Sequence, residues 1–392
     1  MKILLCHNSY KLHGGEDVVY QSEGRLLQDK GHEVIRYHRS NDELDTLGRI
    51  ETLQKLFWNR ETEADVSELI VRERPDILHC TNTFPLISPS IYKAAKIHKV
   101  PVIQSLHNYR LICPSATQLR NGLTCKDCSG KRFAWPAVYH QCYRNSRTAT
   151  AATAAMLGYH HFAGTWSKLV DRYIVLTEYM KQNLVNGGLI EEKLRVKPNF
   201  VGNDTGPGVG KGGYAVFAGR LSEEKGIRIL LDAWSGLASD TQLHILGDGP
   251  LMSQIKAVAR LDSRIVVHGH TDQNTAFEII GDASFLIVPS ICQETFGLCI
   301  IEAYAKGTPV IASDIGSFPD LIKPMETGLL FETGDFADLR QKVENLLQNR
   351  PLSDSMRVKA RTEFENAYTA DQNYKILRSI YDEVLKERAQ TL

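Results

Sequence analysis

Two glutamates eight positions apart have the residue type and the spacing to do chemistry. Glu302 lies in an apolar run whose pattern predicts a helix over Phe296–Lys306. Glu294 lies in the predicted turn Pro289–Glu294, which follows a predicted buried strand at Phe285–Val288. An unpaired carboxylate is costly to bury, so Glu302 needs a partner. That partner is either a Lys or Arg of the same protein or a ligand diol, whose two hydroxyls can both donate to one carboxylate.

A second set of candidates is cationic. In residues 217–226, FAGRLSEEKG, Arg220 ends a predicted strand and Lys225 precedes the helix that follows. A guanidinium that binds two oxygens and a mobile ammonium can stabilise the charge that develops on a departing diphosphate. The simpler interpretation is a solvated surface on which Glu223 and Glu224 pair with these cations.

The elements that must position these residues alternate between strand and helix in both halves of the chain. The predicted strands of the first half are Lys2–Cys6, Glu33–Tyr37, Asp76–Cys80, Val102–His107 and Tyr173–Thr177. Those of the second half are Tyr214–Gly219, Gln242–Leu246, Ile265–His268, Phe285–Val288 and Val310–Ser313. This pattern predicts an α/β fold of two doubly wound parallel sheets. Ligands of such sheets bind beyond the carboxyl ends of the strands, where the candidate residues lie.

A cluster of chain-breaking residues separates the two halves. Residues 201–213 are rich in Gly, which predicts a hinge between a domain at 1–200 and a second domain at 214–368. The last segment, 369–392, has apolar residues at helical spacing and must bury a face. A chain of 392 residues is also too long for one ordinary core, which favours two domains.

The run Pro-Ser…Glu-x-Phe-Gly-x-x-x-x-Glu-Ala-x-Ala-x-Gly-x-Pro-Val resembles the Glu-x7-Glu signature of retaining glycosyltransferase family 4. The resemblance implies the GT-B fold, in which two Rossmann-like domains face a cleft and the last helix returns to the first domain. It assigns Glu302 to the donor's ribose and Glu294 to the donor sugar and diphosphate. It also places Thr295, Phe296, Gly297 and Leu298 along the donor pocket.

The same resemblance assigns roles to other residues of the second half. Arg220 and Lys225 match the positions of the family's leaving-group cations. Gly219, Gly249 and His270 match loops that border the nucleotide, although Gly249 with the following proline also fits a plain turn.

In the first half, Gly14 and Gly15 precede a predicted helix, and loops at this place bind the donor diphosphate or the acceptor in similar enzymes. Their alternative is a plain turn. His107 ends a predicted strand, where it is either structural or close to the donor sugar. Many family members have His-Asp there, whereas this chain has Asn108, so position 108 supplies no base. No well-placed carboxylate nucleophile is found in the loops of this half.

Charge and length exclude several function classes. Lys plus Arg and Asp plus Glu both number 46, so no basic excess indicates a nucleic-acid partner. The first residues have too short an apolar stretch for a signal peptide, and no run of 18 apolar residues exists, so we expect a cytoplasmic protein. The chain has no Asp-x-Asp, which predicts catalysis without a metal or other cofactor.

Four of the eight cysteines follow the spacing C-x11-C-x2-C-x13-C: Cys113, Cys125, Cys128 and Cys142. Their number and spacing suit a structural zinc site in a polar, turn-rich insertion. Reduced thiols or a single disulfide are the alternatives.

Residues 131–172 hold six basic residues against one acidic residue, with aromatic residues between them. This composition suits a peripheral contact with an anionic membrane, at the inner face, or a lipid-linked acceptor. A solvated helical face is the alternative.

We therefore expect a retaining hexosyltransferase of polysaccharide or glycoconjugate biosynthesis. UDP-glucose is the first expectation for its donor and GDP-mannose the chief rival, and the acceptor is an oligosaccharide or lipid-linked glycan. The alternatives are a UDP-sugar epimerase of the same architecture and a non-catalytic nucleotide-sugar-binding partner.

Overall fold

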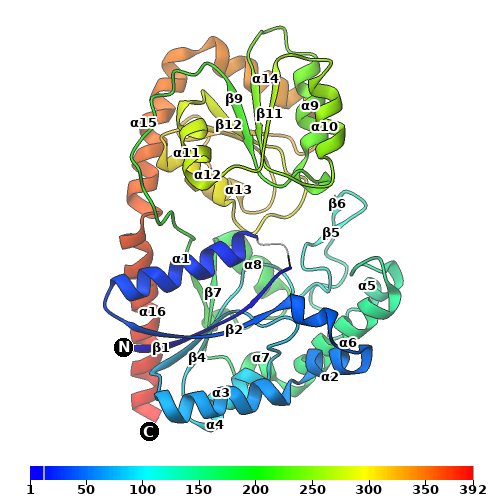
Figure 1. Cartoon of the computed structure of the whole chain (residues 1–392), viewed down its shortest axis with the longest axis vertical. Coiled ribbons are helices and arrows are strands. Elements are labelled where there is room, and N and C mark those ends of the chain that lie inside the picture. Colours follow the sequence, from blue (N-terminus) through cyan, green and yellow to red (C-terminus); the bar gives the residue numbers. More distant parts are fainter. Residues whose placement is uncertain (12–13, 392) are drawn as a thin grey trace. The chain divides into compact units, whose positions relative to one another are not determined.

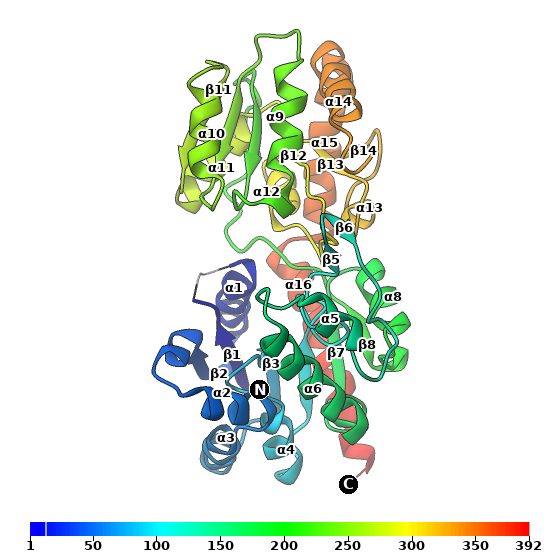
Figure 2. The same ribbon diagram turned by 90° about the vertical axis from the view of Figure 1, so that its right-hand side faces the viewer.

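The computed structural model describes residues 1–11 and 14–391, and the last residue of the predicted C-terminal segment, Leu392, lies outside them. The chain divides into two compact units. The first unit consists of Met1–Gln118, Cys125–Pro198 and the segment that starts at Asn373. The second unit consists of Leu119–Thr124 and Asn199–Gln372. Each unit has its own parallel sheet, whose elements are labelled in Figure 1 and Figure 2.

Within the described residues, the sheet of the first unit has six parallel strands in the order β2-β1-β3-β4-β7-β8. They are β1 (Lys2–Ser9), β2 (Glu33–Ser40), β3 (Ile77–Asn82), β4 (Val102–Ser105), β7 (Arg172–Val175) and β8 (Leu194–Val196). In β1, Leu4 pairs with Ile35 of β2 and with Leu78 of β3. Because β1, β3 and β4 are parallel neighbours, their carboxyl ends meet at one edge.

The helices of the first unit connect these strands. They are α1 (Gly15–Asp29), η1 (Asn41–Asp45), α2 (Arg49–Phe57), α3 (Arg60–Glu73), α4 (Ser90–Ile97), α5 (Trp135–His140), α6 (Arg147–Ala163), α7 (Thr165–Lys168), α8 (Glu178–Asn186) and η2 (Glu191–Lys193).

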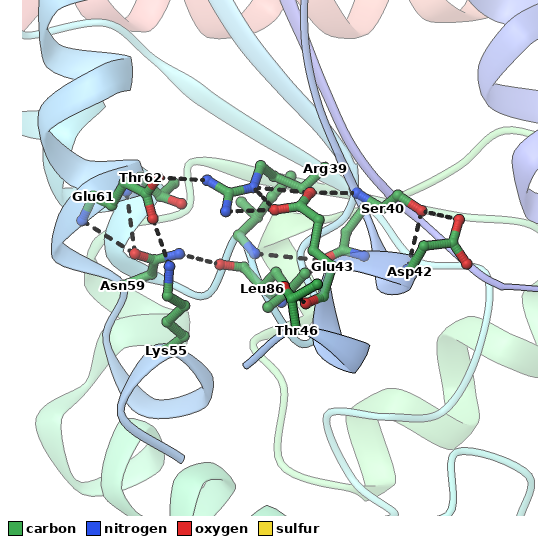
Figure 3. Close-up of polar contacts among 12 residues, drawn as sticks. Arg39, Ser40, Asp42, Glu43, Thr46, Lys55, Asn59, Glu61, Thr62 and Leu86 are labelled. Carbon is green, nitrogen blue, oxygen red and sulfur yellow. Dashed lines mark hydrogen bonds and ion pairs between the residues drawn. The ribbon is translucent and has the colours of Figure 1, made fainter. Parts of the chain in front are cut away.

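Figure 3 shows the hydrogen bonds at the start of α3. The Asn59 side chain accepts from the amides of Glu61 and Thr62 and donates to the carbonyl of Leu86 at 2.6 Å. The Arg39 guanidinium pairs with Glu61 at 3.4 Å, so the network stabilises the helix start.

The C-terminal helix α16 (Ala370–Thr391) closes the core of the first unit. Its predicted apolar face is buried, because Leu377, Ile380, Tyr381 and Val384 are at most 3% exposed. They pack in one cluster with Ile3, Leu27, Ile77, Ile103 and Ile174. A buried ion pair between Lys197 and Glu23, at 2.7 Å, also contacts the Asn373 amide oxygen at 3.3 Å. The helix is therefore part of the first unit's core.

The part of the chain that the structure describes gives the second unit a sheet of six parallel strands, in the order β11-β10-β9-β12-β13-β14. They are β9 (Ala215–Ala218), β10 (Leu243–Leu246), β11 (Ile265–Gly269), β12 (Phe285–Val288), β13 (Val310–Ser313) and β14 (Gly328–Phe331). All ten strands expected from the sequence are present, with end points shifted by at most three residues. The two sheets confirm the predicted α/β fold class, while β8 and β14 were not predicted.

The helices of the second unit are η3 (Glu223–Lys225), α9 (Ile227–Ser235), α10 (Met252–Ala259), α11 (Gln273–Asp282), α12 (Leu298–Ala305), α13 (Phe318–Leu321), α14 (Phe336–Gln348) and α15 (Arg350–Ala367). Figure 1 shows α9 and α10 on one side of the sheet and α11 and α12 on the other. A short antiparallel hairpin, β5 (Leu119–Arg120) and β6 (Leu123–Thr124), is grouped with this unit (Figure 2).

Candidate functional site

Backbone hydrogen bonds join the loops that follow the central strands of the second unit. The amide of Gly247 donates to the carbonyl of Gly269 at 2.7 Å, and the amide of Ile291 donates to the carbonyl of Glu224 at 3.0 Å. The predicted residues lie on these loops: Gly219 and Arg220 after β9, Gly249 after β10, His270 after β11, and Glu294 to Leu298 after β12. The carboxyl edge of this sheet thus gathers the residues that the sequence selected.

Lys225 and Glu294 form an ion pair at this edge. The Lys225 Nζ lies 2.5 Å from Glu294 Oε1, which also accepts from the hydroxyl of Ser290 at 2.9 Å. Burial opposes ionisation of Glu294, but the Lys225 ammonium together with the hydrogen bonds from Ser290 and Cys292 outweighs burial and lowers the pKa of the carboxyl. Burial likewise opposes the charge of Lys225, and the Glu294 carboxylate outweighs it and raises the pKa of Lys225. Both groups are therefore charged at neutral pH.

Gly226 allows this pair to form. Its φ is +70°, and a Cβ built on it would lie 1.7 Å from the carbonyl oxygen of Pro289. Any side chain at position 226 would separate the Lys225 loop from the turn that carries Glu294.

Glu302 is the second carboxylate of the site. It lies on α12, which begins at Leu298 rather than at Phe296, because Gly297 at the N-cap has a φ of 135°. Within residues 1–11 and 14–391 its carboxylate makes no hydrogen bond or ion pair, so the predicted alternative of an internal Lys or Arg partner is wrong. Burial raises the pKa of Glu302 to about 7. The half-buried carboxylate is thus left for a partner from outside.

Arg220 lies at the end of β9 with an exposed side chain. Its guanidinium makes no ion pair among the described residues, since Glu223 pairs with Arg228 at 2.8 Å and Glu224 accepts from Ser222 at 2.6 Å. The interpretation that Glu223 and Glu224 neutralise Arg220 and Lys225 is therefore wrong. At this edge Lys225 is thus held by a carboxylate, whereas the Arg220 guanidinium is available to bind an anion.

The remaining predicted donor-site residues differ in their burial and in their contacts. Phe296 is 3% exposed and packs edge-on against Tyr368, with ring centroids 6.2 Å apart. The carbonyl of Thr295 accepts from the Ser317 hydroxyl at 3.0 Å. The amide of Gly249 donates to the carboxylate of Asp248, and His270 is exposed on its loop. Their roles toward a nucleotide stay predictions.

In the first unit, Gly14 and Gly15 stand at the start of α1. Gly14 is the N-cap with a φ of −129°, which is extended backbone open to any residue. Its amide donates to Asp17 at 2.9 Å, and Asp17 also lies 2.9 Å from His7 Nε2. Asp17 therefore caps the helix start and ties it to β1.

His107 lines a cavity of about 40 Å³ at the carboxyl edge of β1, β3 and β4. Burial lowers the pKa of His107 to about 3, so the imidazole is neutral. Glu16 and Asn108 line the same cavity. Glu16, which the sequence pattern did not single out, places a carboxylate at this edge. Its only sequence signal is its place directly after Gly15.

The four cysteines of residues 113–142 come together in the first unit. Burial, together with the weaker effects of Cys113, Cys142 and Cys125, raises the pKa of Cys128 to about 11. Cys128 and Cys142 pack on a small cluster of buried alanines, and no disulfide joins any of the four cysteines to another described residue. Nowhere in the described chain do three His, Cys, Asp or Glu side chains form a group that could hold a metal ion in this arrangement. Zinc therefore stays a prediction.

Several aromatic side chains of residues 131–172 are exposed. The exposed fractions are 59% for Trp135, 69% for Tyr139 and 68% for Phe162. Among the residues described here, no helix has the length and apolar character needed to cross a bilayer. The predicted peripheral membrane contact stays a prediction.

Two family models match the chain, one in each half. Residues 13–204 match the model described as Glycosyltransferase Family 4, and residues 212–349 match that described as Glycosyl transferases group 1. The chain therefore belongs to the family 4 glycosyltransferases, and its two sheets have the GT-B fold.

Relatives of known sequence and structure are similar over different lengths. An uncharacterized glycosyltransferase of Methanocaldococcus jannaschii is 27% identical over 55% of this chain, which spans only 60% of that relative. The N-acetyl-alpha-D-glucosaminyl L-malate synthase of Bacillus anthracis is 21% identical over 99% of this chain and 98% of its own length. The structure of Anabaena HepE in complex with UDP-glucose superposes with a TM-score of 0.66 at 16% identity, covering 97% of this chain and 100% of HepE.

Proposed function

We propose that this protein transfers a hexosyl group from a UDP-sugar, with UDP-glucose as the first candidate, to a hydroxyl of an oligosaccharide or glycolipid, with retention of anomeric configuration. The observation that carries the proposal is the Glu302 carboxylate, which is half-buried and has no partner within the described residues. A ribose diol would supply two donors to it. HepE, a relative in fold, binds UDP-glucose.

In this proposal the charged residues share the work on the donor. Arg220 and Lys225 hold the diphosphate, and Glu294 keeps the Lys225 ammonium in place beside the sugar. The acceptor oxygen bonds to the anomeric carbon on the face from which the diphosphate oxygen departs, and the acceptor proton passes to that diphosphate oxygen. The products are the new glycoside and UDP. Catalysis then rests on position and electrostatics and needs no metal, so EDTA should leave turnover unchanged.

A thermal-shift panel of UDP, GDP and ADP tests the Glu302 contact. A cognate nucleotide at a hundredfold excess over its Kd should stabilise the wild type by about 2.7 kcal/mol. Glu302→Gln should lose most of that shift, whereas Glu278→Gln, which changes an exposed carboxylate of α11, should keep it. A full shift in Glu302→Gln refutes the contact.

Acceptor-dependent release of UDP tests the reaction itself. A transferase releases UDP in proportion to added acceptor, an epimerase interconverts the UDP-sugar without acceptor, and a non-catalytic binder does neither. The anomeric configuration of the product, determined by NMR, shows whether the configuration of the donor sugar is retained.

We also propose a structural zinc ion bound by Cys113, Cys125, Cys128 and Cys142, because four thiolates suit tetrahedral zinc and the segment around them is rich in turns. Metal analysis of reductant-treated protein should find about one zinc per chain. The double variant Cys125→Ser/Cys128→Ser should lose it, and Cys292→Ser should retain it. A zinc content well below one ion per chain in the wild type would contradict the zinc proposal.

Residues 131–172 are proposed to contact the inner membrane face. Vesicles that contain phosphatidylglycerol should sediment the wild type, and purely phosphatidylcholine vesicles should not. Trp135→Ala should weaken that binding, because its exposed ring would enter the interface. Equal sedimentation with both vesicles contradicts the proposal.

A further inference from the structure

The cavity at the carboxyl edge of the first unit is small, and most of the residues that line it have polar side chains. Its volume of about 40 Å³ has room for a hydroxyl group. Its walls include Tyr10 after β1, Thr81 of β3 and Gln104 of β4, with Glu16 from the first turn of α1. Groups that accept and donate hydrogen bonds therefore surround the space, and the lining also includes the cation Arg110.

Glu16 is turned toward this cavity rather than used for the helix start. Asp17, its neighbour, accepts from the Gly14 amide and contacts His7, so the cap is already satisfied. Glu16 Oε2 instead accepts from the Tyr10 hydroxyl at 2.8 Å. The amide of Asn108 lies 3.5 Å from the same oxygen. The Glu16 carboxylate is thus held by neutral donors only.

Arg110, the cation in the cavity lining, has its own contacts with groups other than Glu16. Its guanidinium lies 4.3 Å from the centre of the Phe84 ring and donates to the carbonyl of Pro114. Its amide donates to the Asn108 side-chain oxygen at 2.9 Å, which orients the Asn108 amide group toward Glu16. In the described part of the chain, Glu16 makes no ion pair and its Oε1 accepts no hydrogen bond.

We propose that Glu16, positioned by Tyr10 and Asn108, binds a hydroxyl of the carbohydrate acceptor in this cavity. The inference rests on the proposed function, because it assigns the acceptor side of the same reaction. A carboxylate with one open oxygen accepts from a sugar hydroxyl, and charge-assisted bonds of this kind are the strong ones. Glu16 would then select acceptors with a hydroxyl group that can enter this cavity, whereas the second unit would bind the donor.

The protonation state of Glu16 links binding to pH. Burial raises the pKa of Glu16 to about 7, with a contribution from Asp17 in the same direction, while Tyr10, Arg110 and Asn108 act against the rise. His107, which lines the same cavity, stays neutral because burial lowers its pKa to about 3. Only the carboxylate form accepts at both oxygens, so acceptor affinity should increase as pH rises through about 7.

Ligand-observed NMR with methyl glycosides of glucose, galactose, mannose and N-acetylglucosamine, with and without UDP, tests the proposal. At least one glycoside should bind the wild type, more tightly at pH 8 than at pH 6. Its Kd should rise roughly tenfold in Glu16→Gln, which should also lose the pH dependence. Glu68→Gln, an exposed carboxylate of α3, should behave as the wild type. Thermal unfolding and circular dichroism would show that both variants fold.

The outcomes separate this inference from the proposed function. Glycoside binding that is unchanged in Glu16→Gln, or no glycoside binding at all, overturns the role of Glu16. If UDP still stabilises the wild type in those cases, the donor side of the proposed function stands. If UDP gives no stabilisation while glycosides bind through Glu16, the donor assignment fails and the sugar site remains.

Discussion

The carboxyl-end edges of the two sheets are built on the same kind of backbone but from different side chains. The second unit's edge is charged: Lys225 pairs with Glu294, and Arg220 and Glu302 have no partners among the described residues. The first unit's edge surrounds the carboxylate of Glu16 with hydroxyl and amide groups, and the cation in its cavity lining, Arg110, lies against the Phe84 ring. A charged edge suits a diphosphate and its ribose, whereas hydroxyl and amide groups suit sugar hydroxyls. Under the proposals above, one architecture would serve two ligand chemistries through its loops.

Removal of the Lys225 ammonium from the second unit's edge should have the largest effect on activity. Lys225→Ala removes the ammonium that we propose holds the departing diphosphate, and it leaves Glu294 without its ion-pair partner. We expect kcat to fall about 10²–10³-fold, measured as acceptor-dependent UDP release. Lys256→Ala, an exposed lysine of α10, serves as the matched control. A kcat close to that of the control would contradict the role of Lys225.

Substitution of a glycine by alanine should change protein stability differently at the two edges. Gly226→Ala places a Cβ 1.7 Å from the Pro289 carbonyl at a φ of +70°, so we expect a loss of about 2 kcal/mol or more in the free energy of unfolding. Gly14→Ala has extended backbone and its nearest other atom 4.0 Å away, so its cost should stay within about 0.5 kcal/mol. Urea denaturation measures both, and equal costs would contradict the comparison.

The two carboxylates of the charged edge should respond to pH with opposite signs. The pKa of Glu302 is raised to about 7, so its folded form binds a proton that the unfolded chain has lost above about 4.5, and stability falls as pH rises between these values. Glu302→Gln removes this loss. The shift corresponds to at most about 3 kcal/mol, and partial exposure reduces the expected gain to about 1 kcal/mol near pH 8, with none near pH 4.

Glu294 supplies the matched comparison, because Lys225 lowers its pKa. Its contribution to stability is present above about pH 4.5 and is lost as pH falls below that value. Glu294→Gln should therefore destabilise the protein at neutral pH and make little difference in acid. Chemical denaturation of both variants between about pH 4 and pH 8 measures how the free energy of unfolding changes with pH. A Glu302→Gln variant that is less stable than the wild type near pH 8 would contradict the comparison.

Hydrophobic pattern was sufficient to predict most of the fold. The strands at Phe285–Val288 and Val310–Ser313 have the predicted bounds, because each is a short apolar run between chain-breaking residues. β8 was missed because only one of its three residues is buried, and β14 was missed because it begins at Gly328 and offers only three apolar residues. The start of α12 was placed too early, because the φ of Gly297 is a property of the packed turn.

Individual residues of the site could be selected from the sequence, but the pairs that they form could not. Glu294 and Glu302 belong to one motif, and their selection needed no structure. The partner of Glu294 is Lys225, 69 positions away, and Glu16 contacts Asn108, 92 positions away. Pattern analysis has no means to find such contacts.

Residue type and local order alone determined which groups of this protein are able to carry charge and which segments become parallel strands. Tertiary structure decided which of those charges are neutralised within the chain and which are left for a ligand. The physical reason is that the ionisation and pairing of a side chain depend on its burial and on neighbours brought near by folding.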